Sequence, residues 1–130
     1  MKRRTFFKSA LALLAGTHVP LAVATSPAPR RLVILHTPIA GAQYYDASQL
    51  SLDDGADRRL TLRREADNRY DQRAVALYWH HHKIGYIPRR QNHAIAQMLD
   101  RGTRMEAHIL TPYGSLQQWE AWEIEVAAVV

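Results

Sequence analysis

The chain has 130 residues, of which 47% are hydrophobic, and a formal net charge of +5 from 17 Lys and Arg against 12 Asp and Glu residues. It contains no cysteine, which excludes disulfides, thiolate metal sites and a catalytic thiol. This length suits one domain built around one hydrophobic core.

The amino terminus has the pattern of a secretory signal peptide. Basic residues at 2–4 precede an apolar stretch that ends in Ala-Val-Ala at 22–24, the small-residue pattern of a cleavage site. The segment "RRTFFK" at 3–8 resembles the twin-arginine signature that an export receptor reads. A transmembrane anchor is the alternative, but the apolar stretch is short for a span and Pro20 interrupts it. We therefore expect cleavage after Ala24 and an exported, periplasmic protein.

Removal of residues 1–24 leaves a nearly neutral chain. Four of the 17 basic residues and none of the 12 acidic ones lie in this segment, so the remainder carries 13 against 12, a net charge of +1. Residues 25–30 are typical of an extended, proline-containing leader, and residues 31–130 form the expected domain. An argument for a nucleic-acid partner therefore depends on local clusters of charge.

Short strands follow one another along the domain. An apolar, β-branched run at 32–35 predicts a buried first strand, and residues 38–50 indicate a strand edge and a turn. Apolar residues alternate with polar ones in the later strands, and Trp122 falls on the core side of the last one. The predicted strands lie near 32–35, 59–63, 74–78, 84–87, 105–109 and 122–126, with turns or loops at 53–55, 80–83 and 112–115.

One helix is predicted between the fourth and fifth strands. Asn92 is placed to cap its start, and Gly102 to end it. Four apolar residues share one face of this helix: Ala94, Ile95, Met98 and Leu99. The predicted class is mainly β, a small α+β domain with a partly closed, OB-like or SH3-like barrel of about six strands and one or two short helices.

Polar and aromatic residues crowd the entrance to the third strand, in "READNRYDQRAVAL" at 64–77. Three further stretches accompany it in order: "GAQYY" at 41–45, "KIGYIPRR" at 83–90 and "NHAIAQMLDRG" at 92–102. Together they resemble the HIRAN domain, which occurs in certain helicases, in helicase-like transcription factor and as stand-alone bacterial proteins. The resemblance spans about residues 31–128 and implies an OB-like barrel that binds single-stranded DNA and captures a free 3′ end.

The resemblance also implies roles for individual residues. Tyr44 and Tyr70 match aromatic residues that stack on terminal bases, and Asp71 matches the acid that accepts a hydrogen bond from the terminal 3′-hydroxyl. Two alternatives follow from the residues alone: tyrosines are common on the rim of a barrel, and an Asp at this place also builds turns.

Four more positions match the family pattern. Asp67 and Asn68 correspond to an amide pair beside the terminal nucleotide, although turn building again explains them equally well. Tyr86 and Arg89 correspond to residues that contact the nucleic-acid backbone.

The chain departs from the family pattern at three positions. Gln43 stands where helicase-like transcription factor has an arginine, Asp67 replaces an amide, and Arg69 replaces a proline. The first two changes lower the expected affinity for a polyanion, and Arg69 partly offsets them.

Arginines surround the polar cluster. Arg63, Arg64 and Arg73 flank it, and Arg89 and Arg90 follow the fourth strand, so a ligand path between them would be positive. Five phosphate contacts would give a log–log salt slope of about −3.5 for a single strand. The alternative is a solvated basic face.

Three consecutive histidines at 80–82 raise the question of a metal site. Only His80 and His82 share a side of a strand, and no thiolate or suitably spaced carboxylate completes a zinc site, so we expect an exposed hairpin tip and no cofactor. Of the two tryptophans near the last strand, Trp119 is the candidate for an exposed partner surface.

The sequence predicts a binding module and no enzyme, because it lacks a defined nucleophile–base pair, a phosphate loop and a zinc motif. The leading hypothesis is a domain that binds single-stranded nucleic acid or its 3′ end. The other is an exported domain that binds a periplasmic protein or peptide in the same groove. Steep weakening with salt would distinguish nucleic-acid binding from an apolar protein contact.

Overall fold

The computed structural model of the protein describes residues 16, 20, 26–49, 57–110 and 122–130. The predicted signal peptide lies almost entirely outside these residues, as do the predicted turn at 53–55, the loop at 112–115 and Trp119. No helix in the described part of the chain is both long enough and apolar enough to cross a membrane.

The described residues form six strands, one α-helix and three 3-10 helices. In chain order they are β1 (Arg31–Pro38), η1 (Ala42–Tyr44), η2 (Asp46–Gln49), β2 (Arg59–Glu65), β3 (Ala74–Trp79), β4 (His82–Tyr86), η3 (Arg89–Gln91), α1 (His93–Asp100), β5 (Arg104–Leu110) and β6 (Glu123–Val129).

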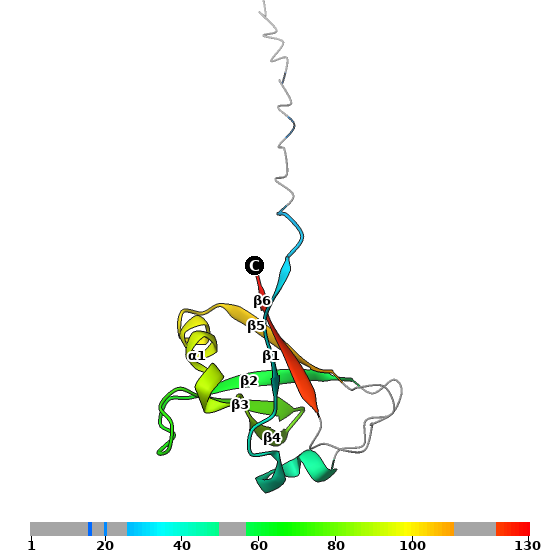
Figure 1. The fold of residues 1–130 in the computed structure, drawn as a ribbon. Coiled ribbons are helices and arrows are strands. Elements are labelled where there is room, and N and C mark those ends of the chain that lie inside the picture. Colours follow the sequence, from blue (N-terminus) through cyan, green and yellow to red (C-terminus); the bar gives the residue numbers. More distant parts are fainter. Residues whose placement is uncertain (1–15, 17–19, 21–25, 50–56, 111–121) are drawn as a thin grey trace, which may run out of the picture.

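The strands form one antiparallel sheet in the order β1-β6-β5-β2-β3-β4. Among the described residues, two pairs, Arg59 with His108 and Leu60 with Ala107, join β2 to β5, which is a short seam beside the seven pairs between β5 and β6. In Figure 1, β1, β5 and β6 cross the direction of β2 and β3. A bridge between Ala40 and Tyr86 links the segment after β1 to β4. The predicted class, mainly β with about six strands and a short helix, is confirmed, although the sheet does not close.

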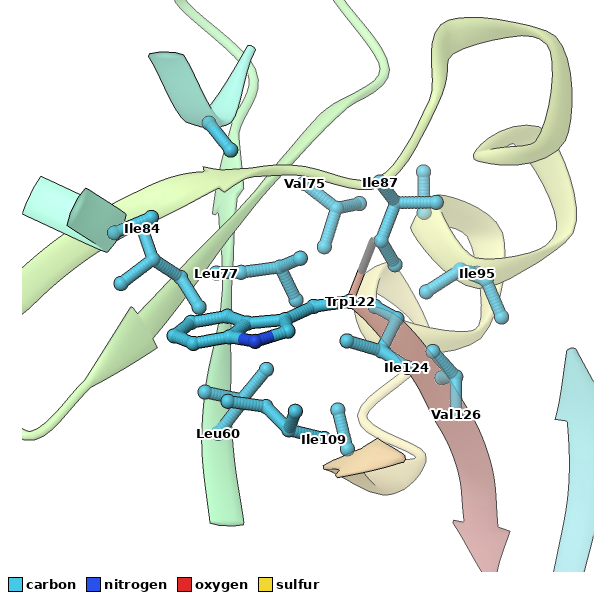
Figure 2. Close-up of a cluster of buried hydrophobic side chains, with 14 residues drawn as sticks. Leu60, Val75, Leu77, Ile84, Ile87, Ile95, Ile109, Trp122, Ile124 and Val126 are labelled. Carbon is cyan, nitrogen blue, oxygen red and sulfur yellow. The ribbon is translucent and has the colours of Figure 1, made fainter. Parts of the chain in front are cut away.

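Trp122 lies at the centre of the core. It is 1% exposed, and Figure 2 shows its ring between side chains of β2, β3, β4 and β5. The alternation in β5 also holds, since Ala107 and Ile109 are buried. These features confirm the core side that the sequence predicts for the last two strands.

The prediction of a buried first strand is wrong. Leu32, Val33 and Ile34 are 50%, 51% and 40% exposed. The reason is that β1 is an edge strand that pairs only with β6, and the register shifts between Val33 and Leu35. Only Thr37, towards the end of β1, is buried.

The helix forms where predicted, with two differences. Its buried residues are Ile95 and Ala96, whereas Ala94 is exposed. Asn92 does precede α1, but its side chain makes no capping bond and has another partner, described below. Gly102, at φ 81°, ends the helix as expected, because its amide donates to the carbonyl oxygen of Leu99.

The segment between β1 and β2 differs from the predicted strand edge. After Gly41, at φ 70°, the chain forms η1 and η2, which lie against β4. The bridge between Ala40 and Tyr86 fixes the start of this segment, with reciprocal backbone hydrogen bonds of 2.8 and 2.9 Å.

Candidate nucleic-acid interface

A cleft of about 260 Å³ opens where η1, the β2–β3 loop and the end of β4 meet. Its lining is mainly apolar and aromatic, with one carboxylate and one guanidinium group. The lining residues are Ala40, Gly41, Tyr44, Tyr45, Asn68, Tyr70, Asp71, Ala74, Tyr86, Ile87 and Arg89. Six predicted site residues therefore meet in one place: Tyr44, Asn68, Tyr70, Asp71, Tyr86 and Arg89.

Two tyrosines from different segments stand free at this cleft. Tyr44 ends η1 and Tyr70 lies in the β2–β3 loop, yet both line the cleft and each is 79% exposed. Neither is a half-buried tyrosine of the barrel rim, as the structural alternative supposed. Both rings are therefore accessible to a ligand ring, although the guanidinium carbon of Arg69 lies 5.7 Å from the centre of the Tyr70 ring.

Asn68 builds the loop that carries Tyr70. Its Oδ1 accepts hydrogen bonds from the backbone amides of Tyr70 at 2.9 Å and Asp71 at 3.1 Å. The backbone amide of Asn68 donates to the backbone carbonyl oxygen of Glu65 at 3.1 Å. The predicted turn-building role is therefore present, and it fixes the backbone from which two cleft residues project.

Asp71 is held by hydrogen bonds to both of its carboxylate oxygens. Oδ1 accepts from the backbone amide of Arg73 at 2.9 Å, and Oδ2 accepts from Nδ2 of Asn92 at 2.7 Å. An ionised carboxylate has about four lone-pair sites, so each oxygen retains room for one more donor. Asp71 is thus an oriented hydrogen-bond acceptor at the cleft.

The floor of the cleft rests on Glu65, at the end of β2. Its carboxylate accepts from the Tyr86 hydroxyl at 2.7 Å, from Lys83 Nζ at 2.7 Å and from Asn68 Nδ2 at 3.1 Å. Glu65 pairs with Ala74. The small side chains of β3 allow it to reach across that strand to β4.

These contacts change the acidity of the groups. Partial burial acts to raise the pKa of Glu65, but the hydrogen bonds from Lys83 and Tyr86 outweigh it and hold the pKa below its ordinary value. Burial also acts against the charge of Lys83, yet the bond to Glu65 raises the Lys83 pKa. Burial raises the pKa of the Tyr86 hydroxyl. At neutral pH, Glu65 and Lys83 form an ion pair, and Tyr86 donates as a neutral phenol.

The predicted arginines divide into two groups. Arg89 lines the cleft, whereas Arg63, Arg64 and Arg90 do not. Arg64 binds Asp100 of α1, with Nε to Oδ1 at 2.9 Å, and ties β2 to the helix. The guanidinium carbon of Arg63 lies 4.3 Å from the centre of the Tyr78 ring.

Two other predicted positions lie apart from the cleft. Asp67 is exposed in the β2–β3 loop and is not among the lining residues. His80 is at the β3–β4 turn with φ 51°, and His82 Nδ1 lies 3.3 Å from Asp46 Oδ2. The described residues contain no cluster of three or more His, Cys, Asp or Glu side chains that could hold a metal ion.

Three contributors were missed as site residues. Tyr45 packs edge-on against Tyr86, with ring centres 5.6 Å apart, and lines the cleft. Glu65 supports the floor, and Asn92, 1% exposed, orients Asp71. Tyr45 was open to prediction from the tyrosine pair in "GAQYY". Asn92 gave no such signal, because an Asn before a helix predicts a cap.

Comparisons with known proteins agree with this fold. The sequence profile of the HIRAN domain matches residues 33–127. The fold resembles the crystal structure of a protein from Lactobacillus plantarum, with a TM-score of 0.64 and 26% identity over 78% of this chain and 97% of that one. It also resembles the crystal structure of the HIRAN domain of human HLTF, with a TM-score of 0.55 and 14% identity over 76% of this chain and 78% of that one. No curated protein sequence matches the chain significantly.

The fold is that of a small β-rich domain with a cleft lined mainly by apolar and aromatic residues. Because the profile covers most of the sequence, the chain belongs to the HIRAN domain family. HIRAN domains are known for nucleic-acid binding and act as binding modules that are not catalytic by themselves.

Proposed function

We propose that the cleft captures the 3′-terminal nucleotide of a single strand of nucleic acid. The observation that carries this proposal is the meeting of two exposed aromatic side chains, Tyr44 and Tyr70, with the carboxylate of Asp71 in one largely apolar cleft. The tyrosines stack on bases, which is sequence-tolerant because every base has a π-face. Arg89 supplies a cation for the backbone.

Asp71 gives the cleft its preference for a free end. An ionised carboxylate only accepts hydrogen bonds, so it favours a 3′-hydroxyl, which donates one. A 3′-phosphate offers negative charge and no such donor at neutral pH, and the two anions repel each other. A strand that continues through the site lacks the hydroxyl as well.

The test is fluorescence anisotropy of residues 25–130, which contain every described strand and helix, with a labelled single-stranded oligonucleotide. We expect tighter binding of a free 3′-hydroxyl than of a 3′-phosphate. Tyr70→Ala removes one stacking face and should weaken binding by about 5- to 150-fold, the equivalent of ~1–3 kcal/mol per base, whereas Tyr70→Phe should retain it. Equal affinity of wild type and Tyr70→Ala would refute the stacking role.

We also propose that the protein acts outside the cytoplasm. The basic start, the apolar stretch and the Ala-Val-Ala triplet at 22–24 support this location. Fractionation of the native host followed by mass spectrometry should find a periplasmic protein that begins at Thr25. A cytoplasmic protein that retains residues 1–24 would contradict it.

Export favours a second candidate function, because chromosomal DNA is absent from that compartment. The same apolar cleft would then hold an extended peptide or a protein loop. Nucleic-acid binding weakens steeply as salt rises, whereas an apolar protein contact does not. A pull-down from periplasmic extract at high salt, with Tyr70→Ala as the control, therefore tests the protein partner.

A further inference from the structure

A second pocket, of about 320 Å³, adjoins the cleft and differs from it in character. It is lined by Arg69, Tyr70, Asp71, Gln72, Arg73 and Arg89, so three of its six lining residues are arginines. Tyr70, Asp71 and Arg89 line both hollows, which makes the second pocket a direct continuation of the cleft.

Three guanidinium groups and one carboxylate, that of Asp71, line this pocket, so its lining carries an excess of positive charge. Among the described residues, no carboxylate oxygen lies within 4.0 Å of the guanidinium nitrogens of Arg69, Arg73 or Arg89. Other arginines of the fold do have such a partner: Arg31, Arg59, Arg64 and Arg104. Nη1 of Arg73 instead lies 3.1 Å from Nδ1 of His93, which brings no negative charge.

Hydrogen bonds hold the loop that carries Arg69 and Arg73. Asn68 Oδ1 fixes the amides of Tyr70 and Asp71, and Asp71 Oδ1 fixes the amide of Arg73. The carboxylate of Asp71 is in turn oriented by hydrogen bonds from the Arg73 amide and from Asn92. Two guanidinium groups from this loop and one from η3 thus lie beside a single carboxylate, and none of the three has a described carboxylate partner. This arrangement favours a bound polyanion.

Building on the function proposed for the cleft, we propose that this pocket binds the phosphodiester groups of the strand whose terminal base occupies the cleft. The base stacks on Tyr70 in the cleft, and the adjoining phosphates contact Arg69, Arg73 and Arg89. The ligand is therefore a strand of at least two or three nucleotides, with its end on one side of Asp71 and its backbone on the other. The sequence predicted Arg73 to flank a positive ligand path and Arg69 to offset a lost phosphate contact, and this pocket gives both side chains a shared place beside the cleft.

Strand length and salt test this proposal. Thymidine oligonucleotides of one to six residues with a free 3′-hydroxyl would compete against a labelled strand for residues 25–130. We expect affinity to rise over the first two or three phosphates and then level off, with a log–log salt slope near −2 for three contacts at about 0.7 each. Arg69→Gln and Arg73→Gln should each reduce the slope by about 0.7 and flatten the gain with length. Arg101→Gln, at an exposed arginine outside both hollows, controls for net charge and should leave the slope unchanged.

The outcomes separate this pocket from the cleft. If a single nucleotide binds as tightly as a hexamer, or if Arg73→Gln leaves the slope as in wild type, the phosphate pocket is overturned while end capture stands. If no oligonucleotide binds, calorimetry with inorganic tripolyphosphate decides the rest. Heat that disappears in the Arg69→Gln, Arg73→Gln double variant would support the pocket and overturn the function of the cleft. Absence of heat in the wild type would overturn both.

Discussion

Asn92 shows how a single buried residue organises the candidate site. It is 1% exposed and donates through Nδ2 to Oδ2 of Asp71 at 2.7 Å, while its Oδ1 has no partner among the described residues. A buried carbonyl oxygen without a donor costs ~1–3 kcal/mol, so the position is not optimised for stability alone. The orientation of the amide is fixed by Asp71, because the reverse orientation would place an oxygen against a carboxylate.

Asn92→Asp should convert this contact into a pH-sensitive defect. Two carboxylates at hydrogen-bond distance repel each other, so one of them takes up a proton and its pKa in the folded state rises above the unfolded value. The cost is therefore greatest at neutral pH, on the order of 1–3 kcal/mol in the free energy of unfolding, and it shrinks as the pH falls through the raised pKa. Urea unfolding at pH 7 and pH 5 measures it. Asn92→Ala, which removes the bond without adding charge, is the control and should show no such recovery.

At the scale of elements, Glu65 joins strands that are not neighbours. It leaves the end of β2, crosses the small side chains at the start of β3 and receives hydrogen bonds from Lys83 and Tyr86 of β4. The side chains of Glu65 and Lys83 are only 19% and 24% exposed, so loss of one charge leaves the other poorly solvated. This ion pair fixes β4, whose end forms one wall of the cleft.

Glu65→Gln should lower the free energy of unfolding by about 1–3 kcal/mol at pH 7, because it leaves Lys83 without a counter-charge. The pKa of Glu65 in the folded state lies below the ordinary 4.5, so its ionic contribution is present above pH 4.5 and is lost as the pH falls further. The difference between wild type and variant should therefore shrink between pH 5 and pH 3. Denaturant titrations over this range measure the difference, and Glu123→Gln, at an exposed position, is the control. A difference between wild type and Glu65→Gln that stayed constant with pH would contradict the prediction.

The later strands were predictable from the sequence because their apolar residues alternate with polar ones, as in Leu60-Thr61-Leu62 and Ala107-His108-Ile109. The exposure of β1 could not be predicted, because an apolar run does not reveal whether another element covers it. The cleft was foreseen where the family resemblance aligned whole motifs, which brought Tyr44 and Tyr70 together. Contacts between distant polar residues were missed: Asn92 lies 21 positions from Asp71, and Arg64 lies 36 from Asp100.

At the scale of the whole molecule, Gly85 allows the segment after β1 to approach β4 closely, although the sheet does not close. Its φ of +149° is rare for residues with a side chain, and an added Cβ would lie 2.5 Å from Cγ2 of Ile39 and 2.6 Å from the carbonyl oxygen of Ala40. That carbonyl accepts from the amide of Tyr86 in the bridge that links the segment after β1 to β4. Since Ala40, Gly41 and Tyr44 line one side of the cleft and Tyr86 another, the same bridge sets the width of the candidate site.

Gly85→Ala should therefore impair stability and ligand binding together. The overlap with Ile39 and Ala40 forces the bridge apart, and with the backbone strain we expect a loss of about 2–4 kcal/mol in the free energy of unfolding. Gly102→Ala is the matched control: its φ is +81°, yet nothing lies within 4 Å of an added Cβ, so only the backbone strain of about 1 kcal/mol remains. Hydrogen exchange should show a faster Tyr86 amide in Gly85→Ala alone, and oligonucleotide affinity should fall only there, under conditions where both variants remain folded. Protection of the Tyr86 amide as in wild type would mean that close approach at Gly85 does not hold the cleft together.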